Sequence, residues 1–77
     1  MIGAYILIQT KVGRGADVTR EISQLDGVTS VETVTGPYDV IAHAESRNLD
    51  GLSRHVVARI QEIDGVSRTL TCPVVRF

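Results

Sequence analysis

The sequence LDGVT at residues 25–29 recurs 38 positions later as IDGVS at residues 63–67, in a chain of 77 residues. A segment with helical periodicity precedes each copy, and a segment rich in Val and Thr follows it. The glycine of each copy suits the left-handed residue that often ends a helix. The repeat therefore predicts a strand–helix–strand unit that is used twice.

Each unit contains one amphipathic helix. In the first unit, Val18, Ile22 and Leu25 fall at i, i+4 and i+7, which is the spacing of a single helical face. In the second unit, Asn48 is a suitable N-cap residue for a longer helix. The apolar face of this longer helix consists of Leu49, Leu52, Val56, Ile60 and Ile63.

A short connection that contains Gly36 and Pro37 joins the two units. So few residues allow only a hairpin-like turn between the second and third strands. Two such units predict a ferredoxin-like βαββαβ fold of the α+β class, in which both helices cover one face of a four-stranded antiparallel sheet. Pro73 requires the last strand to lie at an edge or to contain a bulge. We expect the strands over residues 4–10, 28–35, 38–45 and 66–75.

The second face of the predicted sheet also carries apolar residues. Tyr5, Leu7 and Ile41 fall on the side away from the helices, where a sheet covered on one side normally has polar residues. A domain of this size buries only about 60% of its unfolded surface, and a single cysteine excludes a disulfide framework. We therefore expect a homodimer that packs sheet against sheet, as in dimeric α/β-barrel assemblies.

Charge and hydropathy exclude several classes of function. Eight basic residues are scattered among nine acidic ones, which leaves no basic stripe for the phosphates of a nucleic acid. The longest apolar run, residues 4–8, is too short to cross a bilayer. Because no basic n-region precedes this run and a single cysteine suits a reducing compartment, we expect a cytoplasmic protein.

Few side chains are suited to catalysis or metal binding. His43 is expected to be a partly buried structural residue, and His55 a solvated residue of the second helix. Cys72 lies in an apolar stretch and is expected to be a small buried hydrophobe. Because the sequence has no paired carboxylates, nucleophile–base set or metal-ligand spacing, we expect no catalytic residue, no metal and no cofactor.

The loop Gly13-Arg14-Gly15 follows an expected strand and opens a helix, as an anion-binding loop does. It lacks the third glycine of a dinucleotide-binding loop and the Lys-Ser/Thr pair of a phosphate-binding loop. A flexible connection is therefore the favoured interpretation, with Arg14 available to an anion.

The densest group of polar residues is the turn Thr35-Gly36-Pro37-Tyr38-Asp39 between the two units. Its glycine permits close backbone approach, Thr35 and Tyr38 carry hydroxyls, and Asp39 carries a carboxylate. These groups suit an amino acid, with Asp39 for the ammonium group and free amides and hydroxyls for the carboxylate. Gly, Pro and Asp are also ordinary turn residues, so the pattern is equally typical of a well-made turn.

Two motifs resemble the RAM effector domain (regulation of amino-acid metabolism) of the Lrp/AsnC transcription regulators. Residues 35–39 are similar to the G-x-Y-D signature of that family, with Pro37 at the variable position, and residues 64–71 are similar to its GVxxTxT motif. The resemblance implies a domain that dimerises through its sheets and often assembles into rings, commonly octamers. It also implies a small effector, typically an amino acid, at the contacts between dimers. The implied ligand-binding residues are Thr35, Gly36, Pro37, Tyr38, Asp39, Ser67, Thr69 and Thr71.

The resemblance covers essentially the whole chain, residues 1–77, as one ligand-binding and oligomerisation domain. Full-length members of the family carry an N-terminal helix-turn-helix, whereas Met1 lies a residue or two before the first expected strand. The chain therefore resembles the stand-alone form of the domain. Regulation of transcription is then expected through a partner, such as a full-length relative, and without direct binding to nucleic acid.

Three other classes of protein share this order of elements. An ACT-like regulatory domain usually has a Gly-rich turn after its first strand, which Gly13 and Gly15 allow. An RNA-recognition module would need a basic patch and more stacking residues than Tyr5 and Tyr38. A small dimeric α/β-barrel monooxygenase or isomerase would need a buried cavity, with His43 or Tyr38 as its proton-transfer group.

Overall fold

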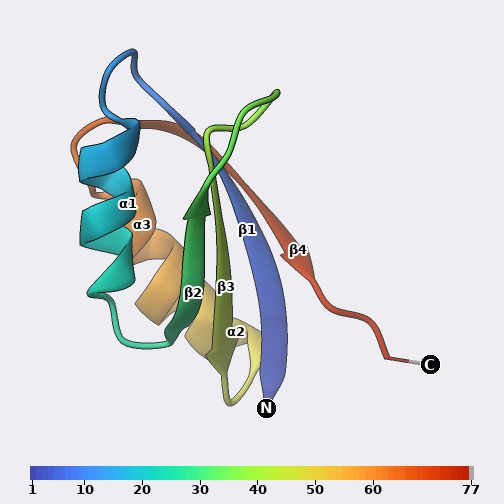
Figure 1. Cartoon of the computed structure of the whole chain (residues 1–77). Helices are drawn as coiled ribbons and strands as arrows, with labels where there is room; N and C mark the ends of the chain where they lie inside the picture. The colour runs from blue at the N-terminus through green and yellow to red at the C-terminus, as the bar shows by residue number, and fades with distance from the viewer. Residues whose placement is uncertain (77) are drawn as a thin grey trace.

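The sheet consists of β1 (Ile2–Thr10), β2 (Val28–Thr33), β3 (Val40–Ser46) and β4 (Val66–Pro73). The structure is a computed structural model that describes residues 1–76. All strand pairs are antiparallel, and the order across the sheet is β2-β3-β1-β4. Figure 1 shows the helices along one face of this sheet. The prediction of a ferredoxin-like βαββαβ fold is confirmed.

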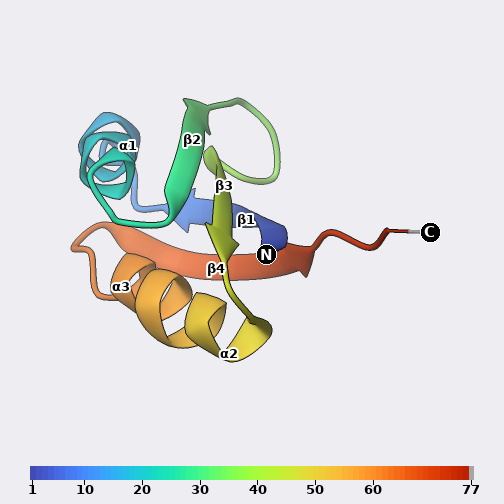
Figure 2. The same cartoon turned by 90° about the horizontal axis from the view of Figure 1, so that it is seen from below.

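The first helix, α1, spans Gly15–Ser23. The second helix comprises α2 (Leu49–Leu52), the π-helical turn η1 (Ser53–Val57) and α3 (Ala58–Gln61), which follow one another without a break. Figure 2 shows α1 alongside β2, and the second helix alongside β4. The sequence periodicity predicts a regular second helix and misses the wider turn η1.

Asn48 caps the second helix as predicted. Its side-chain oxygen accepts a hydrogen bond from the Gly51 amide at 2.7 Å, which satisfies one of the free donors at the start of the helix. Gly27 and Gly65 follow the ends of the two helices, with φ of +92° and +102°. Because few residues other than glycine adopt such angles, the two copies of the repeat have the predicted role of ending the helices.

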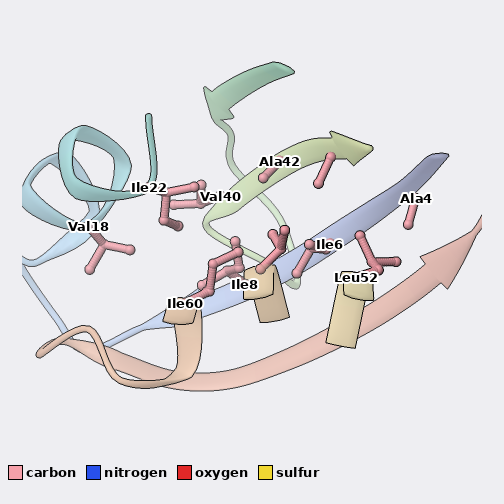
Figure 3. Packing of buried hydrophobic residues seen from close by; sticks show 11 residues of the cluster. Ala4, Ile6, Ile8, Val18, Ile22, Val40, Ala42, Leu52 and Ile60 are labelled. Carbon is pink, nitrogen blue, oxygen red and sulfur yellow. The ribbon is translucent and has the colours of Figure 1, made fainter. Parts of the chain in front are cut away.

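The core lies between the sheet and the helices, and Figure 3 shows the side chains of both layers meeting there. β1 and β3 contribute alternate residues to this core, so their intervening residues lie on the opposite face of the sheet. The fully or almost fully buried hydrophobic residues are Ala4, Ile6, Ile8, Val18, Ile22, Val40, Ala42, Ala44, Leu52, Val56 and Ile60.

The connection between β2 and β3 is longer than predicted. β2 ends two residues early, at Thr33, and β3 begins two residues late, at Val40. Gly36, with φ of +143°, turns the chain out of the ladder. The connection still closes as a hairpin-like turn, because the Val34 amide donates to the Asp39 carbonyl at 2.9 Å.

β4 lies at an edge of the sheet, which is where a strand can contain a proline without interrupting a ladder. The sequence predicts this strand to residue 75, whereas it ends at Pro73. The Val74 amide then donates a single hydrogen bond to the Gly3 carbonyl at 2.8 Å. The edge position of Pro73 is confirmed, and the predicted end of the strand is wrong by two residues.

Candidate functional site

The turn between β2 and β3 is held against the end of β1 by three hydrogen bonds. The Asp39 amide donates to the Ile8 carbonyl at 2.9 Å, and Asp39 Oδ2 accepts from the Thr10 amide at 2.7 Å. Gln9 Nε2 donates to the Pro37 carbonyl at 2.8 Å. The turn projects beyond the end of the sheet (Figure 1), and these bonds fix its position.

The tip of this turn presents backbone donors that the fold does not use. Thr35, Gly36 and Pro37 are exposed, and Tyr38 and Asp39 are half-buried. Within residues 1–76, the amides of Thr35, Gly36 and Tyr38 make no hydrogen bond. A Cβ at Gly36 would meet no atom within 4 Å, so a ligand can approach the backbone closely. Three amide donors and the hydroxyls of Thr35 and Tyr38 are therefore available to a carboxylate.

Ser67 lies at the same end of the sheet as the turn. Its hydroxyl donates to the Gln9 carbonyl at 3.1 Å, while the side chain of Gln9 binds Pro37. Gln9 therefore contacts both motifs. The structure therefore joins Ser67 to residues 35–39 through Gln9, although the two motifs lie about thirty positions apart in the sequence.

Thr69 and Thr71 lie on the face of the sheet that packs against the helices. They pair with Ile8 and Ile6, which are buried against the helices, and cross-strand partners point to the same face. Thr69 Oγ1 also accepts a hydrogen bond from Gln61 Nε2 at 3.0 Å. Within one chain, the structure does not bring these two threonines to the turn.

The face of the sheet away from the helices is apolar, as predicted. We call it the open sheet face, and Leu7 at its centre pairs with Ile41 on one side and Leu70 on the other. Tyr5 and Leu70 are 49% and 47% exposed. His43 is half-buried there, as predicted, with Nδ1 2.6 Å from Thr29 Oγ1 and its ring edge-on to Tyr5 at 4.9 Å.

Cys72 belongs to the open sheet face, and the prediction that it is buried is wrong. It pairs across the strands with Tyr5, which points away from the helices. Its side chain is therefore exposed. The apolar residues around Cys72 in the sequence suggested burial, whereas the register of β4 decides which face it occupies.

Arg14 has an anion partner within the chain. Its Nη1 lies 3.0 Å from Asp64 Oδ2, and its Nε lies 3.5 Å from Asp17 Oδ2. The hydrogen bond from Arg14, and then its charge, lower the pKa of Asp64, and the same contacts raise the pKa of Arg14. The ion pair joins the loop before α1 to the second copy of the repeat, which supports the structural interpretation of residues 13–15.

A groove with a volume of about 440 Å³ lies on the helical side of the molecule. The groove does not follow from the sequence alone, because its two walls come from residues far apart in the chain. The one available signal was the i, i+4 spacing of two basic residues on the second helix, which places them on the same helical face. The groove is lined by Gln24, Leu25, Asp26, His55 and Arg59.

Residues 1–76 contain neither a metal-binding cluster nor a membrane-spanning helix. No three His, Cys, Asp or Glu side chains in this part of the chain lie close enough together to hold a metal ion. No helix in the same range is long and apolar enough to cross a membrane.

Comparison with known sequences shows one family. The family model of the Lrp/AsnC ligand binding domain matches residues 3–77. An uncharacterized HTH-type transcriptional regulator of Pyrococcus horikoshii is 31% identical over 71 residues, which are 88% of this chain and 47% of that protein. The chain thus spans about half the length of this relative. A homocitrate synthase of Sulfurisphaera tokodaii is 34% identical over 59 residues, which are 77% of this chain and 13% of the enzyme.

Comparison with solved structures leads to the same family. The protein TTHA0845 of Thermus thermophilus has a TM-score of 0.92 at 34% identity, over 100% of this chain and 96% of that one. AsnC of E. coli has a TM-score of 0.89 at 27% identity, over 99% of this chain and 52% of that one. A transcriptional regulator of Neisseria meningitidis in complex with L-Met shares the fold, with a TM-score of 0.82 at 18% identity, over 97% and 50% of the two chains. The chain therefore belongs to the Lrp/AsnC ligand-binding domain family.

Proposed function

We propose that this chain is an effector-binding and oligomerisation domain that binds an α-amino acid at the turn of residues 35–39. The single observation that carries the proposal is the set of unused amides of Thr35, Gly36 and Tyr38 in the same turn as the Asp39 carboxylate. Amide N–H groups bind a carboxylate, and an aspartate binds an ammonium group. The carboxylate and the ammonium group of an α-amino acid are attached to the same carbon, and the amides and the Asp39 carboxylate belong to the same turn.

Asp39 can serve the fold and a ligand at the same time. Its Oδ2 accepts from the Thr10 amide, whereas its Oδ1 has no partner within residues 1–76. Oδ1 therefore binds the ammonium group. Ser67, which contacts the same Gln9, adds a hydroxyl to the site. We propose that Thr69 and Thr71, which face the helices in their own chain, contribute to the site of a neighbouring copy.

The open sheet face is the proposed dimer interface. Tyr5 and Leu70 are about half exposed, and Leu7 lies between Leu70 and Ile41 across the strands. Complete burial of one such side chain contributes about 1.5–3 kcal/mol, so a two-fold interface gains this amount twice for each residue. Further assembly of dimers into a ring, an octamer in the commonest form of the family, places the turns at contacts between dimers.

The proposed output is the regulation of transcription through a partner. The relative from Pyrococcus horikoshii is an HTH-type regulator about twice as long, and this chain corresponds to the part that matches the ligand-binding domain. We propose that the chain acts in the cytoplasm, without catalytic activity or direct contact with nucleic acid. Its effector would change its assembly, and thereby its association with a full-length relative.

Calorimetry tests the ligand site. A thermal-shift screen of the twenty amino acids identifies the effector, and titrations then compare the wild type with Asp39→Asn, which keeps an oxygen acceptor but loses the charge. We expect the affinity to fall at least about tenfold, because a hydrogen bond to a charged group is worth about 1.5–3 kcal/mol. Asp50→Asn, an exposed acidic position on the second helix, is the matched control. Equal affinities for the wild type and Asp39→Asn would remove the turn from the site.

A second candidate function is the control of an enzyme by the same ligand-binding chemistry. The supporting observation is the 34% identity to 59 residues of a homocitrate synthase. In that case the partner of this chain is an enzyme instead of a DNA-binding regulator. Affinity purification from cells, with and without the amino acid found in the screen, distinguishes the two classes of partner by mass spectrometry.

A further inference from the structure

The groove on the helical side lies apart from the turn and from the open sheet face. Three of its lining residues, 24–26, follow the end of α1, and the other two belong to the second helix. Figure 1 shows these two helices as neighbours on the same side of the sheet. The volume of about 440 Å³ falls within the range of about 300–1,000 Å³ that is typical of small-molecule sites.

The two walls of the groove carry opposite charges. Arg59 and His55 lie on the wall formed by the second helix, and Asp26 lies on the wall that follows α1. The carbonyl end of α1 adds partial negative charge to the second of these walls. Leu25, which packs partly buried against the core, is the apolar part of the lining.

The polar side chains of the groove are not used by the fold. Within residues 1–76, Asp26, His55 and Arg59 take part in no ion pair and no side-chain hydrogen bond. Arg54 on the same helix shows the contrast, because its Nε lies 3.2 Å from Asp50 Oδ1. The donors and acceptors of the groove are therefore available to a ligand.

The basic wall coincides with the one irregular turn of the second helix. π-helical turns are rare, and they occur frequently at functional sites. The turn η1 (Ser53–Val57) contains His55, and α3, which follows it directly, contains Arg59. This observation is independent of the shape of the groove and points to the same residues.

We propose that the groove is a second ligand site, which binds the zwitterion of an aliphatic α-amino acid. Arg59 binds the carboxylate through its planar guanidinium, Asp26 binds the ammonium group, and Leu25 contacts the side chain. A ligand with a single charge leaves one charged wall without a partner and binds less well. The site lies within one chain, so it does not depend on the oligomer or on the turn.

Amide NMR tests the proposal with L-valine and two analogues that each lack one charge, isovalerate and isobutylamine. L-Valine is expected to cause saturable shift changes at residues 24–26, 55 and 59. Each analogue is expected to bind there at least about tenfold more weakly, which corresponds to about 1.4 kcal/mol. The proposal is overturned if L-valine, up to its solubility limit, causes no saturable change at these amides.

Variants of exposed residues separate this site from the turn. Arg59→Gln and Asp26→Asn are each expected to weaken L-valine binding in the groove about tenfold, whereas Arg54→Gln leaves it unchanged. Wild-type affinity in both groove variants overturns the proposal. L-Valine that shifts only the amides of Thr35, Gly36 and Tyr38 also overturns it, and that result supports the function proposed for the turn.

Discussion

The Thr10 amide donates a hydrogen bond to Asp39 Oδ2 at 2.7 Å, and this bond joins the end of β1 to the turn between the two repeats. Asp39 is half-buried, so its loss affects the fold as well as a ligand. The bond to Thr10 uses one carboxylate oxygen, and the proposed ligand uses the other. Substitutions that keep or remove the acceptor therefore separate the two roles.

Asp39→Ala is expected to lower the free energy of unfolding by about 1.5–3 kcal/mol, because it leaves the Thr10 amide without its charged acceptor. Asp39→Asn is expected to cost less, since its amide oxygen can still accept the bond. Urea denaturation of both variants measures the difference. A loss below about 0.5 kcal/mol for Asp39→Ala, the range of ordinary surface substitutions, would show that the bond does not stabilise the turn.

Gly65→Ala is expected to destabilise the protein more than Gly13→Ala. Both glycines have positive φ, +102° and +80°, so alanine is strained at either position. Only at Gly65 would a Cβ also lie 3.0 Å from Arg14 Cβ and 3.1 Å from Val18 Cγ2, whereas at Gly13 it meets nothing within 4 Å. We expect a difference of about 1–3 kcal/mol from this overpacking, measured by urea denaturation. An equal loss of unfolding free energy in Gly65→Ala and Gly13→Ala would contradict the close packing of the second repeat.

The Arg14–Asp64 pair predicts that the stability of the fold depends slightly on pH in the acidic range. The native pKa of Asp64 lies below its ordinary value of 3.8, so the ionised carboxylate stabilises the fold above that value. The contribution is lost as the pH falls through the lower native pKa. The effect is small because the Asp64 side chain is 79% exposed.

Carboxyl-carbon NMR measures this pKa directly. In Arg14→Gln, the pKa of Asp64 is expected to rise towards its ordinary value, because the variant removes both the hydrogen bond and the charge that lower it. Arg20→Gln is the control, since Arg20 pairs with Asp17 instead. An unchanged Asp64 pKa in Arg14→Gln would show that the ion pair is absent in solution.

Leu70→Lys is expected to weaken the proposed dimer at least about a hundredfold. A two-fold interface loses the burial of two leucines, each worth about 1.5–3 kcal/mol, and acquires two buried charges. Val12→Lys is the control, because Val12 is fully exposed in the loop before α1. Sedimentation equilibrium of the two variants gives the dissociation constants. An undisturbed dimer in Leu70→Lys would exclude the open sheet face as the interface.

Local sequence patterns predicted the features that depend on neighbouring residues. The repeated glycines end both helices, Asn48 caps the second one, and the alternation in β1 places its residues on the correct faces. Each of these features follows from chemistry within a few positions of the chain. The late start of β3 was not predictable in this way, because Asp39, just before it, binds Ile8 and Thr10 of β1, which lie far away in the sequence.

The placement of the functional groups depended on tertiary structure. The register between β1 and β4 shifts between Gln9 and Thr10, and it determines that Cys72 lies on the open sheet face while Thr69 faces the helices. The groove beside Arg59 exists only because the residues that follow α1 lie beside the second helix, which belongs to the other repeat. A sequence motif can identify such residues but cannot place them on a common surface.

The central claim is that an amino acid bound at residues 35–39 changes the assembly of this chain. Sedimentation velocity tests it most directly, with the amino acid that gives the largest thermal shift titrated into the wild type and into Asp39→Asn. We predict that the mass of the wild-type assembly changes on binding, and that Asp39→Asn needs at least about tenfold more amino acid for the same change. A wild-type mass that is constant at saturation, or an equal response of the two proteins, would contradict the account.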